Sequence, residues 1–112
     1  MTFDAFDVVV VPFPFTDRTT TKRRPALVLS GAQSFNRKVG QAVMAMITSA
    51  KNSDWPLDID IEDLDSAGLP APSIVRMKLF TLDEQLVVRK AGMLGVADRE
   101  KVVSVLHQLL NL

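Results

Sequence analysis

Short β-branched and apolar runs dominate the first half of the chain and predict strands. Residues 7–11 are a valine-rich run too short for a helix, and Pro12 and Pro14 should end it. Residues 25–30 and 41–48 form two further apolar runs, each followed by turn-forming residues. We therefore expect three largely buried strands in this half of the chain.

The second half continues the strand pattern. Residues 57–61 alternate perfectly between apolar and acidic, so the apolar side chains should face the core and the carboxylates should face water. Residues 73–81 predict a fifth strand, and residues 85–90 a shorter sixth strand or an irregular extension. The polar segment 16–22 and the proline-containing segment 62–72 predict an exposed loop and a connecting loop.

Only the C-terminal segment has helical spacing. It begins at Asp98, a good N-cap, and its expected apolar stripe consists of Val102, Val103, Leu106, Leu109 and Leu110. Five or six short strands with one closing helix indicate a mainly β fold, a strongly bent antiparallel sheet or small barrel. A site on so small a sheet must lie on its loops or on one open face.

Composition restricts the class of protein. The 112 residues suit one domain over 1–112, and 47% hydrophobic with 23% charged residues is typical of a folded chain. The absence of cysteine excludes disulfides and thiolate metal sites and is compatible with a reducing cytoplasm. Acids near the N-terminus argue against a signal peptide, and no apolar run reaches the roughly 18 residues of a membrane span.

The charges are segregated although the net charge is zero. Residues 16–38 hold six bases against Asp17 alone, whereas residues 54–66 hold six acids and no base. One end of the domain could therefore attract a polyanion. The alternative is that both runs are simply solvated loops.

Several segments resemble the MazF/PemK toxin family. Residues 7–17 followed by 22–30 are similar to its N-terminal signature, a strand, a Phe-Pro-Phe turn, a polar loop, Arg-Arg-Pro and a second strand. Residues 45–49 resemble the third strand with its terminal threonine, and residues 73–76 with 81–83 resemble a later strand and turn. The resemblance thus covers nearly the whole chain.

The resemblance implies an SH3-like barrel with a C-terminal helix that acts as a cytoplasmic homodimer. The implied activity is metal-independent, sequence-specific cleavage of single-stranded RNA such as mRNA, without a cofactor, which inhibits translation and growth. It also implies a cognate antitoxin that covers the active face with its C-terminal segment, and contact with operator DNA through that antitoxin.

Two residues match the family's catalytic pair. Arg24, held extended by the proline after it, matches the catalytic arginine, and its planar fork suits two phosphate oxygens. Thr48 matches the threonine opposite, whose hydroxyl can donate to the phosphate or to the leaving oxygen. Further RNA-binding candidates are Thr16, Lys22, Arg23, Ser49, Trp55, Arg76 and Lys78.

The chain also departs from the family pattern. Some members use an Arg-x-Asp pair as acid and base in the later strand, but here Lys78 follows Arg76, so a general base is missing there. Phe6 replaces a usual glycine, which concerns only a turn. We interpret His107 as a surface or interface residue of the helix.

Rings that could stack on RNA bases are few. The candidates are Phe15, Phe35 and Trp55, of which Trp55 follows a polar turn and should be exposed. The methionines at 44, 46 and 77 are expected to fill the core.

Three alternatives remain open on the sequence alone. Arg24 could be an ordinary surface arginine and Thr48 ordinary turn chemistry. The barrel could be a binding poison like the CcdB gyrase inhibitors, although the chain lacks their aromatic C-terminus. It could also be a non-catalytic module that binds a peptide or a nucleic acid, which the lysine at position 78 favours.

Overall fold

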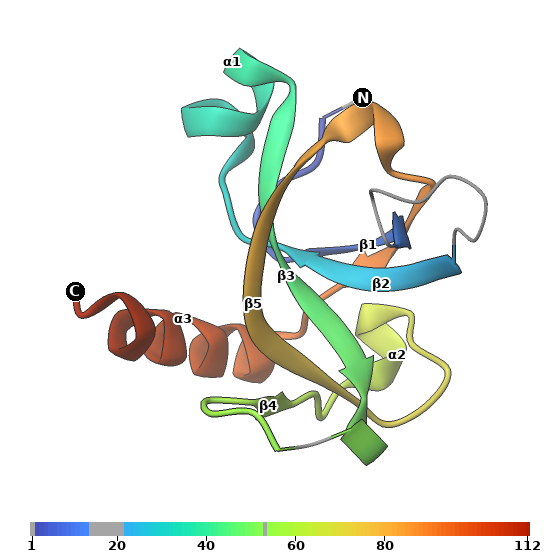
Figure 1. The fold of residues 1–112 in the computed structure, drawn as a ribbon, viewed down its shortest axis with the longest axis vertical. Coiled ribbons are helices and arrows are strands. Elements are labelled where there is room, and N and C mark those ends of the chain that lie inside the picture. Colours follow the sequence, from blue (N-terminus) through green and yellow to red (C-terminus); the bar gives the residue numbers. More distant parts are fainter. Residues whose placement is uncertain (1, 14–21, 53) are drawn as a thin grey trace.

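The computed structural model describes residues 2–13, 22–52 and 54–112, which form one antiparallel sheet and a C-terminal helix (Figure 1). The strands are β1 (Asp7–Phe13), β2 (Lys22–Val28), β3 (Gln41–Ser49), β4 (Ile59–Asp60), β5 (Ser73–Asp83) and β6 (Arg89–Met93). Their order is β4-β5-β3-β2-β1-β6, and the sheet curls into a half-barrel. The helices are α1 (Arg37–Val39), α2 (Leu64–Ala67) and α3 (Val96–Leu110). The expected mainly β class with a closing helix is confirmed.

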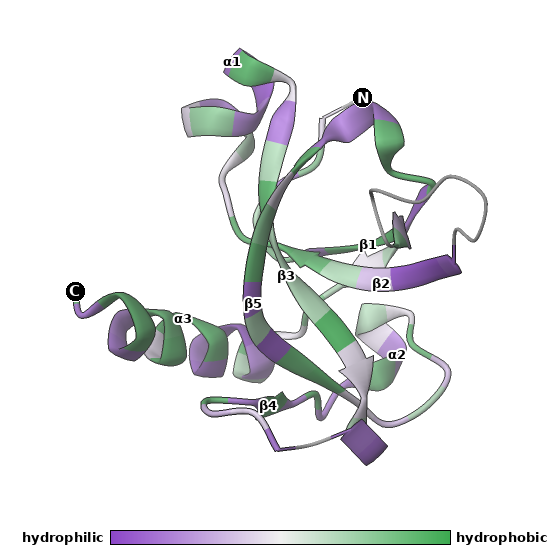
Figure 2. Ribbon diagram, in the orientation of Figure 1, coloured by the Kyte–Doolittle hydropathy of each residue, from purple (hydrophilic) through white to green (hydrophobic). Residues whose placement is uncertain are grey.

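Both faces of the central strands carry a hydrophobic core, because successive side chains of a strand point to opposite faces. The first core contains Val8, Leu27, Ala45, Ile47, Val75 and Val102 of α3. The second core contains Val9, Val11, Ala26, Val28, Met44 and Leu82. Figure 2 shows that β2 changes along its length, from a hydrophilic beginning to a hydrophobic end. The hydrophilic beginning is the part of β2 that lies beyond both cores.

Two strand boundaries differ from the sequence prediction. β1 does not end before Pro12 but continues to Phe13, with Pro12 in register with Arg23. The pairing of β1 with β6 stops at Val10, so β1 is an edge strand at Pro12, where the missing N–H is tolerated. The sixth strand exists, but a 3-10 turn (Glu84–Leu86) precedes it and moves its start to Arg89.

The prediction that only the tail is helical is wrong. A π-helical turn (Ala32–Asn36) leads into α1, a 3-10 turn (Ala50–Asn52) follows β3, and α2 occupies part of the expected loop 62–72. In α2 the Asp63 carboxylate accepts the Ser66 amide, and Gly68 ends the helix in the left-handed conformation. These helices are too short for a helical period to show in the sequence.

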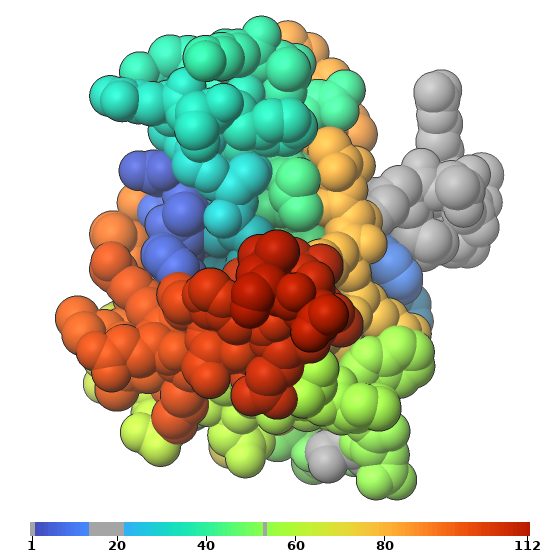
Figure 3. All heavy atoms as spheres, turned by 90° about the vertical axis from the view of Figure 1, so that its left-hand side faces the viewer, coloured from blue at the N-terminus to red at the C-terminus, as the bar shows by residue number. Residues whose placement is uncertain are grey.

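The C-terminal helix begins earlier than expected, and only part of its expected stripe packs on the core. Gly95, not Asp98, is its N-cap, and Asp98 is buried in the first turn, where it accepts the amides of Glu62 and Asp63. Of the expected stripe only Val102 is fully buried, and Val103 is 42% exposed. Val102 and Leu106 of that stripe pack against the core as expected, together with Val105, whereas Val103, Leu109 and Leu110 are exposed. In Figure 3, α3 lies across the outside of the molecule beside the β4 and α2 segments.

Candidate functional site

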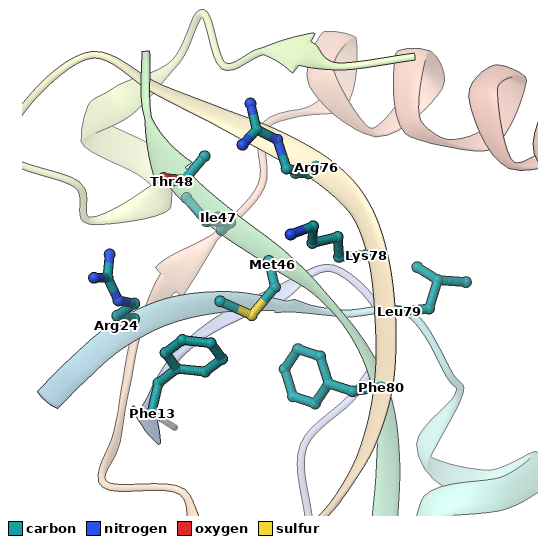
Figure 4. A pocket seen from close by; sticks show the side chains of 9 residues that line it. All are labelled: Phe13, Arg24, Met46, Ile47, Thr48, Arg76, Lys78, Leu79 and Phe80. Carbon is teal, nitrogen blue, oxygen red and sulfur yellow. The ribbon is translucent and has the colours of Figure 1, made fainter. Parts of the chain in front are cut away.

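A cavity of about 320 Å³ opens where the second core ends, between β1, β2, β3 and β5 (Figure 4). It continues the sheet face that buries Val11, Ala26 and Met44. The lining side chains are Phe13, Arg24, Met46, Ile47, Thr48, Arg76, Lys78, Leu79 and Phe80. One face of the sheet is therefore a buried hydrophobic core at one end and a polar, cationic cavity at the other.

Strand register brings Arg24 and Thr48 to the same cavity. The pairing of β2 with β3 ends at Ala26 and Met46, and Arg24 and Thr48 lie two residues farther along their strands. Two residues is the side-chain repeat of a strand, so both point to the face of the last paired residues. Both are half-buried and line the cavity, with Arg24 on its β2 side and Thr48 on its β3 side (Figure 4).

Each of these two side chains is held by a neighbour. The guanidinium carbon of Arg24 lies 5.7 Å from the centroid of the Phe13 ring, a cation–π contact. Its Nε is buried and has no hydrogen-bond partner among the described residues. Thr48 Oγ1 accepts a hydrogen bond of 3.2 Å from Asn52 Nδ2, which leaves its own proton available to a ligand.

An irregularity of β5 places a lysine in this cavity. Ala45 of β3 pairs with Leu79, but the next residue, Met46, pairs with Arg76. Met77 and Lys78 are therefore extra residues in a β-bulge, a feature that redirects side chains. Met77 is buried in the first core, whereas Lys78 is exposed and lines the cavity.

The Arg76 guanidinium is engaged within the chain. Its Nε donates to Asp58 Oδ1 at 3.2 Å, and its Nη2 donates to Asp58 Oδ2 at 2.9 Å and to the carbonyl of Asn52. The hydrogen bond to Asp58 raises the pKa of Arg76 above its ordinary value, although burial opposes this. Arg76 thus fastens Asn52 and Asp58, which lie on either side of Trp55 in the sequence, to β5.

The fastened segment carries the Trp55 ring. Lys78 Nζ lies 4.6 Å and the Arg76 guanidinium carbon 5.8 Å from the centroid of this ring. Trp55 is 42% exposed, as expected, and its amide donates to Asp58 Oδ2 at 3.3 Å. The alternating pattern predicted that Asp58 would face open water. Instead, Arg76 draws its carboxylate against β5.

Two more hollows adjoin the cavity through Arg24. One, of about 410 Å³, is lined by Lys22, Arg23, Arg24, Thr48, Ser49 and the segment 69–73. The other, of about 290 Å³, is lined by Arg23, Arg24, Arg89 and the segment 68–70. Among the described residues that line these three hollows there are six bases and no acid. A separate hollow beside α3 is instead lined by Asp58, Asp60, Glu62 and Glu100 with Lys101.

Comparison with known proteins identifies the family. The PemK-like, MazF-like toxins of type II toxin–antitoxin systems match the chain over residues 4–110. The chain belongs to this family. A search of curated protein sequences finds no match to this toxin.

Solved structures show the same fold for this toxin. The MazE–MazF complex of Deinococcus radiodurans (Form-III) aligns with TM-score 0.79 and 23% identity over 100% of this chain and 99% of that one. An endoribonuclease in complex with its cognate antitoxin, from a mycobacterial species, aligns with TM-score 0.77 and 18% identity over 99% of this chain and 95% of that one. Mycobacterium tuberculosis toxin MazF-mt6 aligns with TM-score 0.74 and 17% identity over 95% of this chain and 97% of that one.

The predicted site residues of this toxin mostly converge. Arg24, Thr48, Arg76 and Lys78 line the cavity, Trp55 faces its two β5 cations, and Lys22, Arg23 and Ser49 line the adjoining hollow. Thr16 and Phe15 lie outside the described residues. Phe35 is exposed on the π-helical turn before α1 and lines none of the three hollows. His107 is exposed on α3, as interpreted.

Sequence reasoning missed three groups at the cavity. Met46 was expected in the core, but it is half-buried and lines the cavity, whereas Met44 and Met77 are core residues. Phe13 and Phe80 are part of the apolar lining, and the available signal was that each stands two residues from a core residue, Val11 or Leu82. No sequence signal connects Asp58 with Arg76, since Asp58 lies just before β4 and Arg76 lies in β5.

Two further properties bear on the class of site. In the described part of the chain, no group of three or more His, Cys, Asp or Glu side chains is arranged to hold a metal ion. Over the same residues, no helix is long and apolar enough to cross a membrane.

Proposed function

We propose that this toxin is a metal-independent endoribonuclease that cuts single-stranded RNA through attack of the 2′-hydroxyl on the adjacent phosphodiester. The observation that carries the proposal is the meeting of Arg24 and Thr48 in one cavity whose described lining is cationic and free of carboxylates. Such a lining favours a polyanion and favours negative charge that develops at a bound phosphate.

The reaction can be assigned to these side chains. The 2′-oxygen bonds to phosphorus, the bond from phosphorus to the 5′-oxygen breaks, and the products are a 2′,3′-cyclic phosphate and a 5′-hydroxyl. The Arg24 guanidinium, through two parallel hydrogen bonds, stabilises the extra negative charge of the phosphorane. Thr48, oriented by Asn52, donates its hydroxyl proton in a hydrogen bond to a phosphate oxygen.

The two protons need separate routes. The proton of the 2′-hydroxyl passes to solvent, because no described carboxylate lines the cavity. Lys78 Nζ, which projects into the cavity, is the donor to the departing 5′-oxygen. Arg76 positions the Trp55 segment and contributes positive charge, and Trp55 offers a ring on which a base can stack.

The family and its solved complexes support the proposed setting. We infer a cognate antitoxin that covers the cationic cavity, a homodimer as the active form, a cytoplasmic location and contact with operator DNA through the antitoxin. The sequence-specific target is mRNA, cut at a short motif, so that translation and growth stop. These inferences follow from membership of the family and from complexes of its structural neighbours with antitoxins.

A second candidate is RNA binding without cleavage, which the lack of a carboxylate among the described lining residues favours. Purified protein in EDTA separates the two, because the enzyme should yield fragments that end in a 2′,3′-cyclic phosphate. Arg24→Ala should lower the rate at least ~100-fold, the size typical of removing one transition-state donor. The matched control is Arg37→Ala, an exposed arginine of α1 that lines none of the three hollows. Undiminished cutting by Arg24→Ala would reject the mechanism.

A further inference from the structure

The three cationic hollows adjoin one another around the beginning of β2, because neighbouring hollows share lining residues. The main cavity and the next hollow share Arg24, Ile47 and Thr48. That hollow and the last one share Arg23, Arg24, Pro25, Leu69 and Pro70. A ligand held at Arg24 can therefore extend in two directions, toward Lys78 on one side and toward Arg89 on the other.

The arm that ends at Arg89 has a cation without an ion-pair partner in the part of the chain that the structure describes. Arg89 is exposed at the start of β6, in register with Val10, and forms no ion pair with the described residues. The next residue, Lys90, is different, because its Nζ lies 3.2 Å from Asp7 Oδ1. Arg23 lines the same arm and is likewise exposed. With Arg24, three arginines thus line a hollow whose described lining has no carboxylate.

This arm also has an apolar wall. Leu69 and Pro70 form it, directly after Gly68, which has a positive φ of 70°. A Cβ at Gly68 would overlap the carbonyl of Ala91 in β6, so glycine allows the wall to approach the sheet closely. The arm is therefore a slot whose lining combines guanidinium groups with an apolar surface.

We propose that this arm binds the nucleotide that flanks the scissile phosphodiester, with Arg23 and Arg89 at its phosphate and the Leu69–Pro70 wall against its sugar or base. The proposal rests on the proposed function and adds Arg89 as a binding residue. A single-stranded polynucleotide suits such a slot, because its charge follows the backbone while its apolar faces stay available. Arg89 takes no part in the chemistry.

Salt dependence of binding tests the proposal. The probe is a fluorescein-labelled, random-sequence 2′-O-methyl oligonucleotide of about ten residues, which cannot be cleaved and matches common single-strand site sizes. Its dissociation constant is measured by anisotropy between about 50 and 200 mM salt. Because each phosphate contact contributes about 0.7 to the log–log slope for a single strand, Arg89→Gln should lower the slope by about 0.7.

Two variants control for charge alone. Lys38→Gln removes an equal charge from α1, outside all three hollows, and should leave the slope unchanged. Arg89→Lys keeps the charge and should restore most of the slope. Equal slopes for Arg89→Gln and Lys38→Gln, whether both fall or neither does, would overturn the assignment of Arg89.

The outcomes separate this inference from the proposed function. If the wild-type protein does not bind the oligonucleotide, the flanking site is refuted, and cleavage of RNA in EDTA decides the proposed function separately. If it binds and Arg24→Ala abolishes cleavage while Arg89→Gln has the wild-type slope, the endoribonuclease stands and only the flanking site is refuted. Circular dichroism of each variant checks that the fold is retained, which the exposure of Arg89 leads us to expect.

Discussion

Asp98 joins the start of α3 to the connection between β4 and α2, and replacing it with asparagine should destabilise the protein without changing its chemistry. Its side chain is 1% exposed. Oδ1 accepts the Glu62 amide at 3.1 Å, and Oδ2 accepts the Asp63 amide at 3.0 Å and the Glu62 amide at 3.2 Å. An asparagine has one acceptor oxygen, so its amino group would face an amide donor.

The cost follows from the contacts that are lost. A hydrogen bond to a charged group contributes about 1.5–3 kcal/mol, and a buried donor left unpaired costs a similar amount. Loss of a negative charge in the first turn of a helix adds about 0.3–1 kcal/mol. Since one of the two amide partners is retained, the free energy of unfolding should fall by about 2–4 kcal/mol.

Urea unfolding followed by circular dichroism measures this loss. With a slope of about 1–3 kcal/mol per molar, the midpoint of Asp98→Asn should fall by roughly 1–2 M at an unchanged slope. Glu100→Gln, an exposed acid on the same helix, should change stability by less than about 0.5 kcal/mol. The rate of RNA cleavage per folded molecule should equal that of the wild type, because Asp98 lines none of the three cationic hollows. A midpoint shift like that of Glu100→Gln would show that Asp98 does not hold the connection.

Two further predictions concern the acids of the connection between β3 and β5. Asp58→Asn removes the ion pair with Arg76, so the fluorescence of Trp55, the single tryptophan, should shift to the red and be quenched more by iodide, whereas the exposed Asp60→Asn should behave like the wild type. Unchanged emission in Asp58→Asn would refute the fastening role. Ser66→Ala removes the hydrogen bond that most lowers the pKa of Asp63, so NMR titration should give a higher value. The lowered pKa of Asp63 stabilises the wild-type fold at pH values above the ordinary pKa of aspartate. This stabilisation is lost as the pH falls through the lowered pKa, so the stabilities of the two proteins should converge in acid.

The strands and the site pair could be predicted because their signals are local. Valine runs and alternation gave the central strands, and a proline after Arg24 marked an extended entry into β2. The joint placement of Arg24 and Thr48 came from the family resemblance, and the register of β2 with β3 supplies its structural basis. A side-chain period of two was enough to assign faces wherever the strands stay regular.

The features that could not be predicted depend on contacts between distant segments. The bulge at Met77 and Lys78 leaves no mark in β5, whose sequence is uniformly strand-like. The burial of Asp98 depends on where residues 62 and 63 lie, and that is fixed only by the packing of α3. The α3 stripe was only partly correct, because apolar side chains occur on two sides of this helix and only the sheet decides which side is covered. Val102 and Leu106 pack on the core as predicted, whereas Val103, Leu109 and Leu110 are exposed.

The lysine at position 78 does not simply remove an acid from the site. In some members of the family that this chain resembles, an acid stands two residues after the arginine in the same strand, where this chain has Lys78. Here the carboxylate comes from Asp58, ahead of β4, so Arg76 keeps a partner while Lys78 adds an unbalanced charge to the cavity. Asp58 lines the hollow beside α3 and does not line the cavity that Arg24 and Thr48 share. Binding of a polyanion should therefore depend more on salt in this chain than in a member with the paired acid, and proton removal from the 2′-hydroxyl should depend more on solvent.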